Sequence, residues 1–162
     1  MSIIGLYLIF AMLAVMYFDV TRFIIPNWLV GSLLLVYPIA VYMSPNAIDW
    51  QSGLMALGIV FAIGYVVFAM KWMGGGDIKL ITACALWVGM PNLMEFVFVT
   101  ALFGGVFAVA LWGLRKVLPH ILKAKKQWPR ILREGEPAPY GVAIAGCMLW
   151  LISDGRLSAI LG

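Results

Sequence analysis

Apolar residues dominate six stretches of the chain, and polar residues gather between them. A helix that crosses a bilayer needs about 20 mostly apolar residues, with a usual range of roughly 17–25. The pattern predicts an all-α integral membrane protein with about six transmembrane helices, in a single domain that covers residues 1–162. The six stretches lie near residues 2–18, 28–43, 51–70, 78–90, 93–114 and 139–153.

The fourth stretch, at residues 78–90, is short for a complete span. Two structures fit it: a helix that starts below the lipid surface, or a helix that continues through the sequence "MPN" into its neighbour. The first stretch begins "MSIIGLYLIF", without the basic residues that open a cleaved signal peptide. We therefore expect the first stretch to remain as a span.

The composition of the chain supports a membrane location. Hydrophobic residues make up 64% of the sequence and charged residues 11%, against roughly 45–50% and 25% in soluble domains. The mean hydropathy is +1.03. A soluble domain of 162 residues is too small to cover so much apolar surface, so the lipid bilayer is the expected surroundings.

The basic residues orient the expected spans. Ten of the eleven Lys and Arg residues fall in connections on one side, and Arg156 alone lies on the other. By the positive-inside rule the basic side faces the cytoplasm, which places both termini outside. The ten are Arg22, Lys71, Lys79, Arg115, Lys116, Lys123, Lys125, Lys126, Arg130 and Arg133.

A large basic loop at residues 115–138 separates the last two spans. It mixes Leu, Ile and Trp with Lys and Arg, which predicts an interfacial amphipathic segment, interrupted at Pro119 and Pro129. Attraction to anionic lipid headgroups accounts for the net charge of +4. No recognition motif accompanies the basic residues, so we expect no nucleic-acid partner.

The residues that usually hold metals or nucleotides are sparse. Cys84 and Cys147 lie inside apolar stretches, where a free thiol usually acts as a small hydrophobic group. His120 has no carboxylate or thiol at ligand spacing, so we expect no metal site. The sequence "GGGDIK" lacks the Lys-Ser/Thr ending of a phosphate-binding loop, so we expect no nucleotide.

Among the seven acidic residues, only Asp19 and Asp77 share one membrane level and one side. Both acids could have a purely structural role. Asp19 could pair with Arg22 at the end of a helix, and Asp77 could cap the N-terminus of the fourth span. The alternative is a catalytic pair, because two carboxyls brought close together do not both ionise easily. One then activates water while the other protonates the leaving amine, as in an aspartic protease.

Three sequence motifs resemble those of the type IV prepilin peptidases, a family of intramembrane aspartic proteases. "GGGDIK" is similar to the family's G-x-G-D-x-K signature, and "DVTRFIIPN" to its first aspartate motif. "PAPYGVAI", which opens the last span, is similar to its Pro-Tyr-Gly motif. The resemblance implies that Asp19 and Asp77 are catalytic. It also assigns a substrate-binding or site-shaping role to Pro26, Asn27, Gly74, Gly75, Gly76, Lys79, Tyr140 and Gly141.

The resemblance also implies a reaction and a substrate. Members of this family remove the short basic leader from prepilin or pseudopilin precursors at the cytoplasmic face of the bacterial inner membrane, without a metal or an organic cofactor. Larger members carry an additional domain with paired CxxC motifs and methylate the new N-terminus. This sequence contains neither, so we expect peptidase activity without methyltransferase activity, as in the short branch associated with tight-adherence (Flp) pili.

Glycines 74 to 76 remove side chains next to Asp77, which would let an extended substrate backbone approach. Lys79 would hold a substrate carbonyl or anchor the chain at the inner face. Either aspartate can take the role of base. The alternative function is a small transporter or pilus-assembly scaffold that binds protons or cations at the Asp pair. A transporter usually has its polar groups near the bilayer midplane, often in a fold with internal repeats. Here the acids cluster at one face and the sequence shows no repeat, which favours the enzyme.

Overall fold

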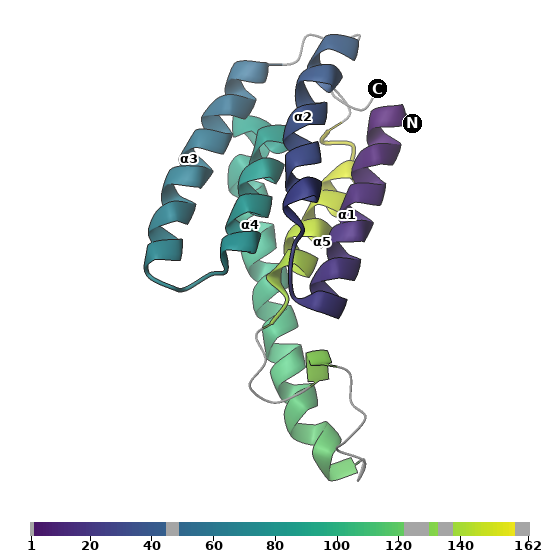
Figure 1. Cartoon of the computed structure of the whole chain (residues 1–162), viewed down its shortest axis with the longest axis vertical. Coiled ribbons are helices and arrows are strands. Elements are labelled where there is room, and N and C mark those ends of the chain that lie inside the picture. The colour runs from purple at the N-terminus through teal and green to yellow at the C-terminus, as the bar shows by residue number, and fades with distance from the viewer. Residues whose placement is uncertain (1, 45–48, 122–129, 133–137, 158–162) are drawn as a thin grey trace.

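The computed structural model shows the chain as a bundle of helices (Figure 1), which confirms the all-α class. It describes residues 2–44, 49–121, 130–132 and 138–157. A single-turn 3-10 helix, η2 at Arg130–Leu132, follows α4. The helices are α1 (Ile3–Arg22), α2 (Asn27–Met43), α3 (Trp50–Ala69), α4 (Gly75–Ile121) and α5 (Tyr140–Ser153).

Several of these helices have the length and composition of membrane spans. Among the described residues, three helical stretches are long and apolar enough to cross a bilayer: Ile3–Arg22, Trp50–Ala69 and Gly75–Val117. Helices α2 and α5 are apolar but shorter. The membrane class predicted from the sequence is thus supported, and the number of crossings is taken up below as part of the proposed topology.

Helix α4 contains a break at Gly89, which divides it into a first arm, residues 75–88, and a second arm, residues 90–121. Gly89 has φ 66° and ψ 173°, a region that is essentially restricted to glycine. The Met90 N–H, which the break leaves without a helical partner, donates to Ser52 Oγ at 2.8 Å. Helical backbone resumes at once through "MPN", so the fourth and fifth predicted spans lie on the two arms.

The two arms run in opposite directions. The first arm starts next to the end of α1 and reaches Ser52, near the start of α3, at the break. The second arm starts where Glu95 pairs with Arg156, beyond the end of α5, and runs back to Gly104, which lies against Tyr140 at the start of α5. The reversal returns the chain to the end of the bundle where the first arm begins, so that α5 starts beside Asp19 and Asp77.

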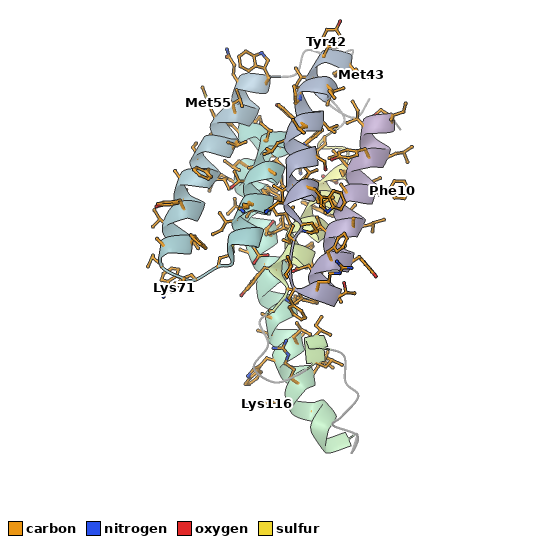
Figure 2. The ribbon with its side chains drawn as sticks, in the orientation of Figure 1. Phe10, Tyr42, Met43, Met55, Lys71 and Lys116 are labelled. Carbon is orange, nitrogen blue, oxygen red and sulfur yellow. The ribbon has the colours of Figure 1, made fainter. Side chains whose placement is uncertain are left out.

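A buried stripe along α1 explains why one acidic side chain lies inside the bundle. Residues 4, 8, 11, 12, 15 and 19 are buried, with the spacing of one helix face. The stripe packs against buried residues of α2, α4 and α5, where Trp87 Nε1 donates to the Leu33 carbonyl at 3.1 Å. Large apolar side chains such as Phe10, Tyr42 and Met55 point outward (Figure 2). Asp19 therefore continues an otherwise apolar stripe.

The basic loop starts later than predicted. Helix α4 continues to Ile121, so residues 115–121 are helical and the expected interruption at Pro119 is wrong. A proline in the last turn removes one hydrogen bond and leaves the preceding turns intact. Arg115 donates from Nε and from a terminal guanidinium nitrogen to the Ile131 carbonyl, at 3.0 and 2.8 Å, which joins α4 to η2. Pro129 and the rest of the loop, apart from η2 and Ala138, lie outside the described residues.

Substitution of Gly89 by alanine should destabilise the bundle. Its φ of 66° is unfavourable for alanine, and a Cβ would lie 3.2 Å from Ser52 Oγ. We expect a loss of about 1–3 kcal/mol of unfolding free energy, measured by thermal unfolding in detergent. Gly105→Ala is the matched control, because Gly105 is helical and a Cβ there meets nothing within 4 Å. Equal unfolding temperatures for the two variants would show that the break is not constrained.

Candidate active site

Asp19 is held in place by the start of the last helix. Its side chain belongs to a residue that is only 4% exposed, and Oδ2 accepts from the Val142 N–H at 3.1 Å. The Gly141 N–H also donates to this carboxyl. These donors lie in the first turn of α5, where the helix dipole is positive, and the only backbone acceptor of the Val142 N–H among the described residues is the Pro139 carbonyl, at a longer 3.4 Å. Since the N-cap residue Pro139 makes no side-chain cap, Asp19 caps α5 from 123 residues away.

Asp77 approaches the same point from the first turn of α4. Its carboxyl interacts electrostatically with that of Asp19 and with the Gly141 N–H. The two acids predicted from the sequence thus lie close enough to interact, beside the start of α5. Asp77 also lies where a carboxylate stabilises a helix dipole, so its position satisfies the capping role as well.

The structural alternative for Asp19, a pairing with Arg22, is not observed. The Arg22 guanidinium lies over the Phe18 ring, 5.3 Å from its centroid. No ion pair between Asp19 and Arg22 occurs in the part of the chain that the structure describes. Asp19 is therefore oriented by the backbone of α5 and not by a neighbouring cation.

Glycine is required beside the carboxyls, most strongly at Gly141. A Cβ at Gly141 would lie 2.7 Å from Asp19 Oδ2, closer than real Cβ contacts, and 3.0 Å from Ile25 Cδ1, which is tighter than most of them. A Cβ at Gly74 would lie 3.1 Å from Asp77 Oδ2, whereas at Gly76 the nearest atom, Ile25 Cβ, would be 3.7 Å away. The tightest constraint is thus in the Pro-Tyr-Gly motif, and within the glycine run it is at Gly74.

A pocket of about 970 Å³ opens in front of the two carboxyls. Its walls come from the connection between α1 and α2, the connection between α3 and α4, and the start of α5. Gly141 lies against Asp19 and does not line the pocket. The pocket is lined by both aspartates and by seven other residues named in the sequence analysis: Pro26, Asn27, Gly74, Gly75, Gly76, Lys79 and Tyr140.

A hydrogen bond joins two of the motifs across the pocket. Lys79 Nζ donates to Asn27 Oδ1 at 3.2 Å, and both residues are exposed. The bond connects the first residue of α2 to the start of α4. It therefore helps to fix the glycine run relative to the turn that follows Asp19.

Sequence reasoning missed several side chains that line the pocket. They follow Asp19 or precede the glycine run, and proximity to a motif is the only signal that could have found them: Phe23, Ile24, Phe68, Lys71, Trp72 and Met73. Cys84 and Cys147 are buried in the helix bundle and do not line this pocket. No group of three or more His, Cys, Asp or Glu side chains suited to a metal ion occurs among the described residues.

Comparison with known proteins gives two matches. The sequence profile of the type IV leader peptidase family matches residues 6–109, a range that contains Asp19 and Asp77. The chain is also 24% identical, over 159 residues, to the prepilin leader peptidase/N-methyltransferase of Dichelobacter nodosus. That alignment covers 91% of this chain and 49% of the relative, so the chain spans about half the relative's length. No solved structure matches the chain.

The family match and the site geometry are consistent with each other. The matched range includes the end of α1, the glycine run and the first arm of α4, which supply both carboxyls. The start of α5, which supplies the backbone donors, lies beyond it. Since the profile matches well over half of the 162 residues, the chain belongs to the type IV leader peptidase family.

Proposed function

We propose that this protein is an intramembrane aspartic endopeptidase that removes the short basic leader from prepilin-like precursors. The observation that carries the proposal is that the Asp19 and Asp77 carboxyls, close enough to interact electrostatically, line one pocket beside the start of α5. Membership of the type IV leader peptidase family supports the reaction class and the substrate class.

The chemistry follows from two carboxyls in different protonation states. The ionised carboxyl takes a proton from water, and the water oxygen forms a bond to the scissile carbonyl carbon. The protonated carboxyl hydrogen-bonds the carbonyl oxygen, on which negative charge develops. The C–N bond then breaks as the protonated carboxyl gives its proton to the leaving amine, and the two carboxyls have exchanged protonation states. Neither a metal nor a cofactor is required for this sequence of steps.

The glycines would let the substrate reach the carboxyls. A helical peptide hides its scissile carbonyl in its own hydrogen bonds, so cleavage requires an extended segment. Such a segment needs space for its main chain beside Asp77, which glycines 74 to 76 leave free. Pro26 and Tyr140 would form parts of the opposite wall.

We also propose a topology in which α1, α2, α3, both arms of α4 and α5 each cross the bacterial inner membrane. The pocket then opens at the cytoplasmic face, and residues 44 and 154 lie outside. The positive-inside rule supports this orientation, because Arg22, Lys71 and Lys79 all lie at the pocket end. A precursor would enter with its basic leader inside and its apolar segment in the bilayer.

Replacement of either aspartate by asparagine should abolish cleavage. The amide keeps the shape of the carboxyl but does not transfer the proton, so we expect at least about a 100-fold loss in rate. The measurement is the appearance of shortened precursor in membranes that contain Asp19→Asn or Asp77→Asn. Asp154→Asn is the control, because Asp154 lies at the opposite end with Arg156 and should cleave normally.

Near-normal cleavage by Asp19→Asn or Asp77→Asn would rule out the two-carboxyl mechanism. If the wild-type protein itself yields no shortened product from any prepilin-like precursor, the peptidase proposal fails. The alternative function, a proton-binding or cation-binding membrane protein, would then be the better account.

Gly141→Ala should inactivate the protein while the helices still form. The added Cβ would occupy space 2.7 Å from Asp19 Oδ2 and displace the carboxyl from its backbone donors. We expect cleavage to fall at least about tenfold, since small displacements of catalytic groups have large effects on rate. Gly146→Ala, one turn further along α5, is the control, because its Cβ would only approach Phe103 Cδ2 at 4.0 Å. Equal activity of the two variants would contradict the role of Gly141.

The topology predicts opposite labelling of two single-cysteine variants. Ser44, which ends α2, should be reached by a membrane-impermeant thiol reagent from outside when it is replaced by cysteine. Met70, which ends α3 and is exposed, should be reached only from inside. Both native cysteines are buried, so the wild-type chain is the unlabelled control. The reverse pattern would place the pocket on the wrong face.

A further inference from the structure

Two residues that line the pocket have a left-handed backbone. Phe23 has φ 56° and Lys71 has φ 59°, and they are the only non-glycine residues with positive φ in the described part of the chain. An L-residue with a Cβ is disfavoured in this conformation, because the Cβ comes close to a carbonyl oxygen. Both residues lie on the walls in front of the carboxyls.

The conformation arises where two helices end. After α1, the Phe23 N–H donates to the Asp19 carbonyl at 3.0 Å. After α3, the Lys71 and Trp72 N–H groups donate to the carbonyls of Phe68 and Val67, at 2.9 and 3.2 Å. These are the hydrogen bonds of common helix C-terminal turns, in which the left-handed position is usually glycine.

The chain itself provides the comparison at the other end of the bundle. Helix α5 ends in the same kind of turn, where Gly155 and Arg156 donate to the carbonyls of Ile152 and Leu151, at 3.3 and 3.2 Å. There the left-handed residue, with φ 74°, is a glycine. Glycine is therefore enough to form this turn, and the turn itself does not call for a larger side chain. The bulky side chains at the pocket need a different explanation.

We infer that Phe23 and Lys71 contact the precursor and help to determine which precursor is cut. The inference rests on the proposed peptidase function. Phe23 lies four residues after Asp19, where its ring forms an apolar wall for a substrate side chain. Lys71 is exposed at the turn between α3 and α4 (Figure 2), where its ammonium donates to an acceptor oxygen of the precursor.

The surroundings of Lys71 favour this role over a structural one. Its ammonium has no ion-pair or hydrogen-bond partner within the ranges that the structure describes. Lys79, by contrast, already donates to Asn27. Lys71 is therefore the cation on the pocket wall that is available to a ligand.

Glycine substitutions separate binding from stability. Phe23→Gly and Lys71→Gly remove the side chain and relieve the backbone at the same time. We expect each variant to unfold at the same temperature as the wild type or higher, while KM for the precursor rises about tenfold. The measurements are thermal unfolding in detergent, and kcat and KM with a purified prepilin-like precursor. A side chain that served only the fold would lower the unfolding temperature when removed.

Two controls complete the comparison. Gly155→Ala should lower the unfolding temperature without changing KM, because its backbone has the same conformation but lies far from the pocket. Lys71→Arg should retain a KM near that of the wild type, since it keeps the donor. If Phe23→Gly does not fold, Phe23→Asn is used in its place, because asparagine tolerates a left-handed backbone.

Wild-type KM in the folded glycine or asparagine variants would overturn the inference. Failure of both Phe23 variants to fold would also count against it for Phe23, because the ring would then be a structural requirement. Failure of the proposed function would look different, since the wild-type protein itself would not cleave the precursor.

Discussion

The hydrogen bond from the Val142 N–H to the Asp19 carboxyl connects the fold to the proposed chemistry. It joins the first helix to the last, and at 3.1 Å it is shorter than the other contact of the same N–H, 3.4 Å to the Pro139 carbonyl. In a bilayer an unsatisfied backbone donor costs several kcal/mol, so this contact stabilises the start of α5. The carboxyl that we assign to catalysis thus also positions its own backbone donors. Its replacement by asparagine keeps an acceptor oxygen and tests the chemistry with little change in structure.

Burial of polar groups in an apolar bundle imposes the same requirement elsewhere. The break at Gly89 leaves a backbone donor free, and the Ser52 hydroxyl accepts from it. The indole of Trp87 donates to the Leu33 carbonyl inside the core. The first contact joins the break to the start of α3, and the second joins α4 to α2. The second arm of α4 returns the chain to the end where Asp19 and Asp77 lie, so that α5 starts beside both acids, which a single straight helix of that length could not do.

Much of the fold could be predicted from the sequence, because apolar stretches mark the helices directly. The shared level of Asp19 and Asp77 followed from the placement of these stretches, and the pocket brings both acids together. The partner of Asp19 could not be predicted, since the donors are backbone N–H groups and carry no side-chain signal. The end of α4 was placed too early because Lys and Arg in its last turns resemble a loop.

The left-handed backbone at Phe23 and Lys71 was also beyond sequence reasoning. A glycine at such a position would have indicated the turn, whereas phenylalanine and lysine are unremarkable in a membrane protein. The departure from the usual residue is informative only once the pocket is seen beside it. Local sequence and structure disagree at these two positions, as they often do at functional sites.

Mass spectrometry of a single cleavage reaction tests the central claim most directly. Purified protein in lipid nanodiscs is incubated with a synthetic prepilin-like precursor, with and without a metal chelator. The account predicts one cut, at the junction between the basic leader and the apolar segment, and the same rate in both samples. An intact precursor, or cuts scattered along the chain, would contradict it.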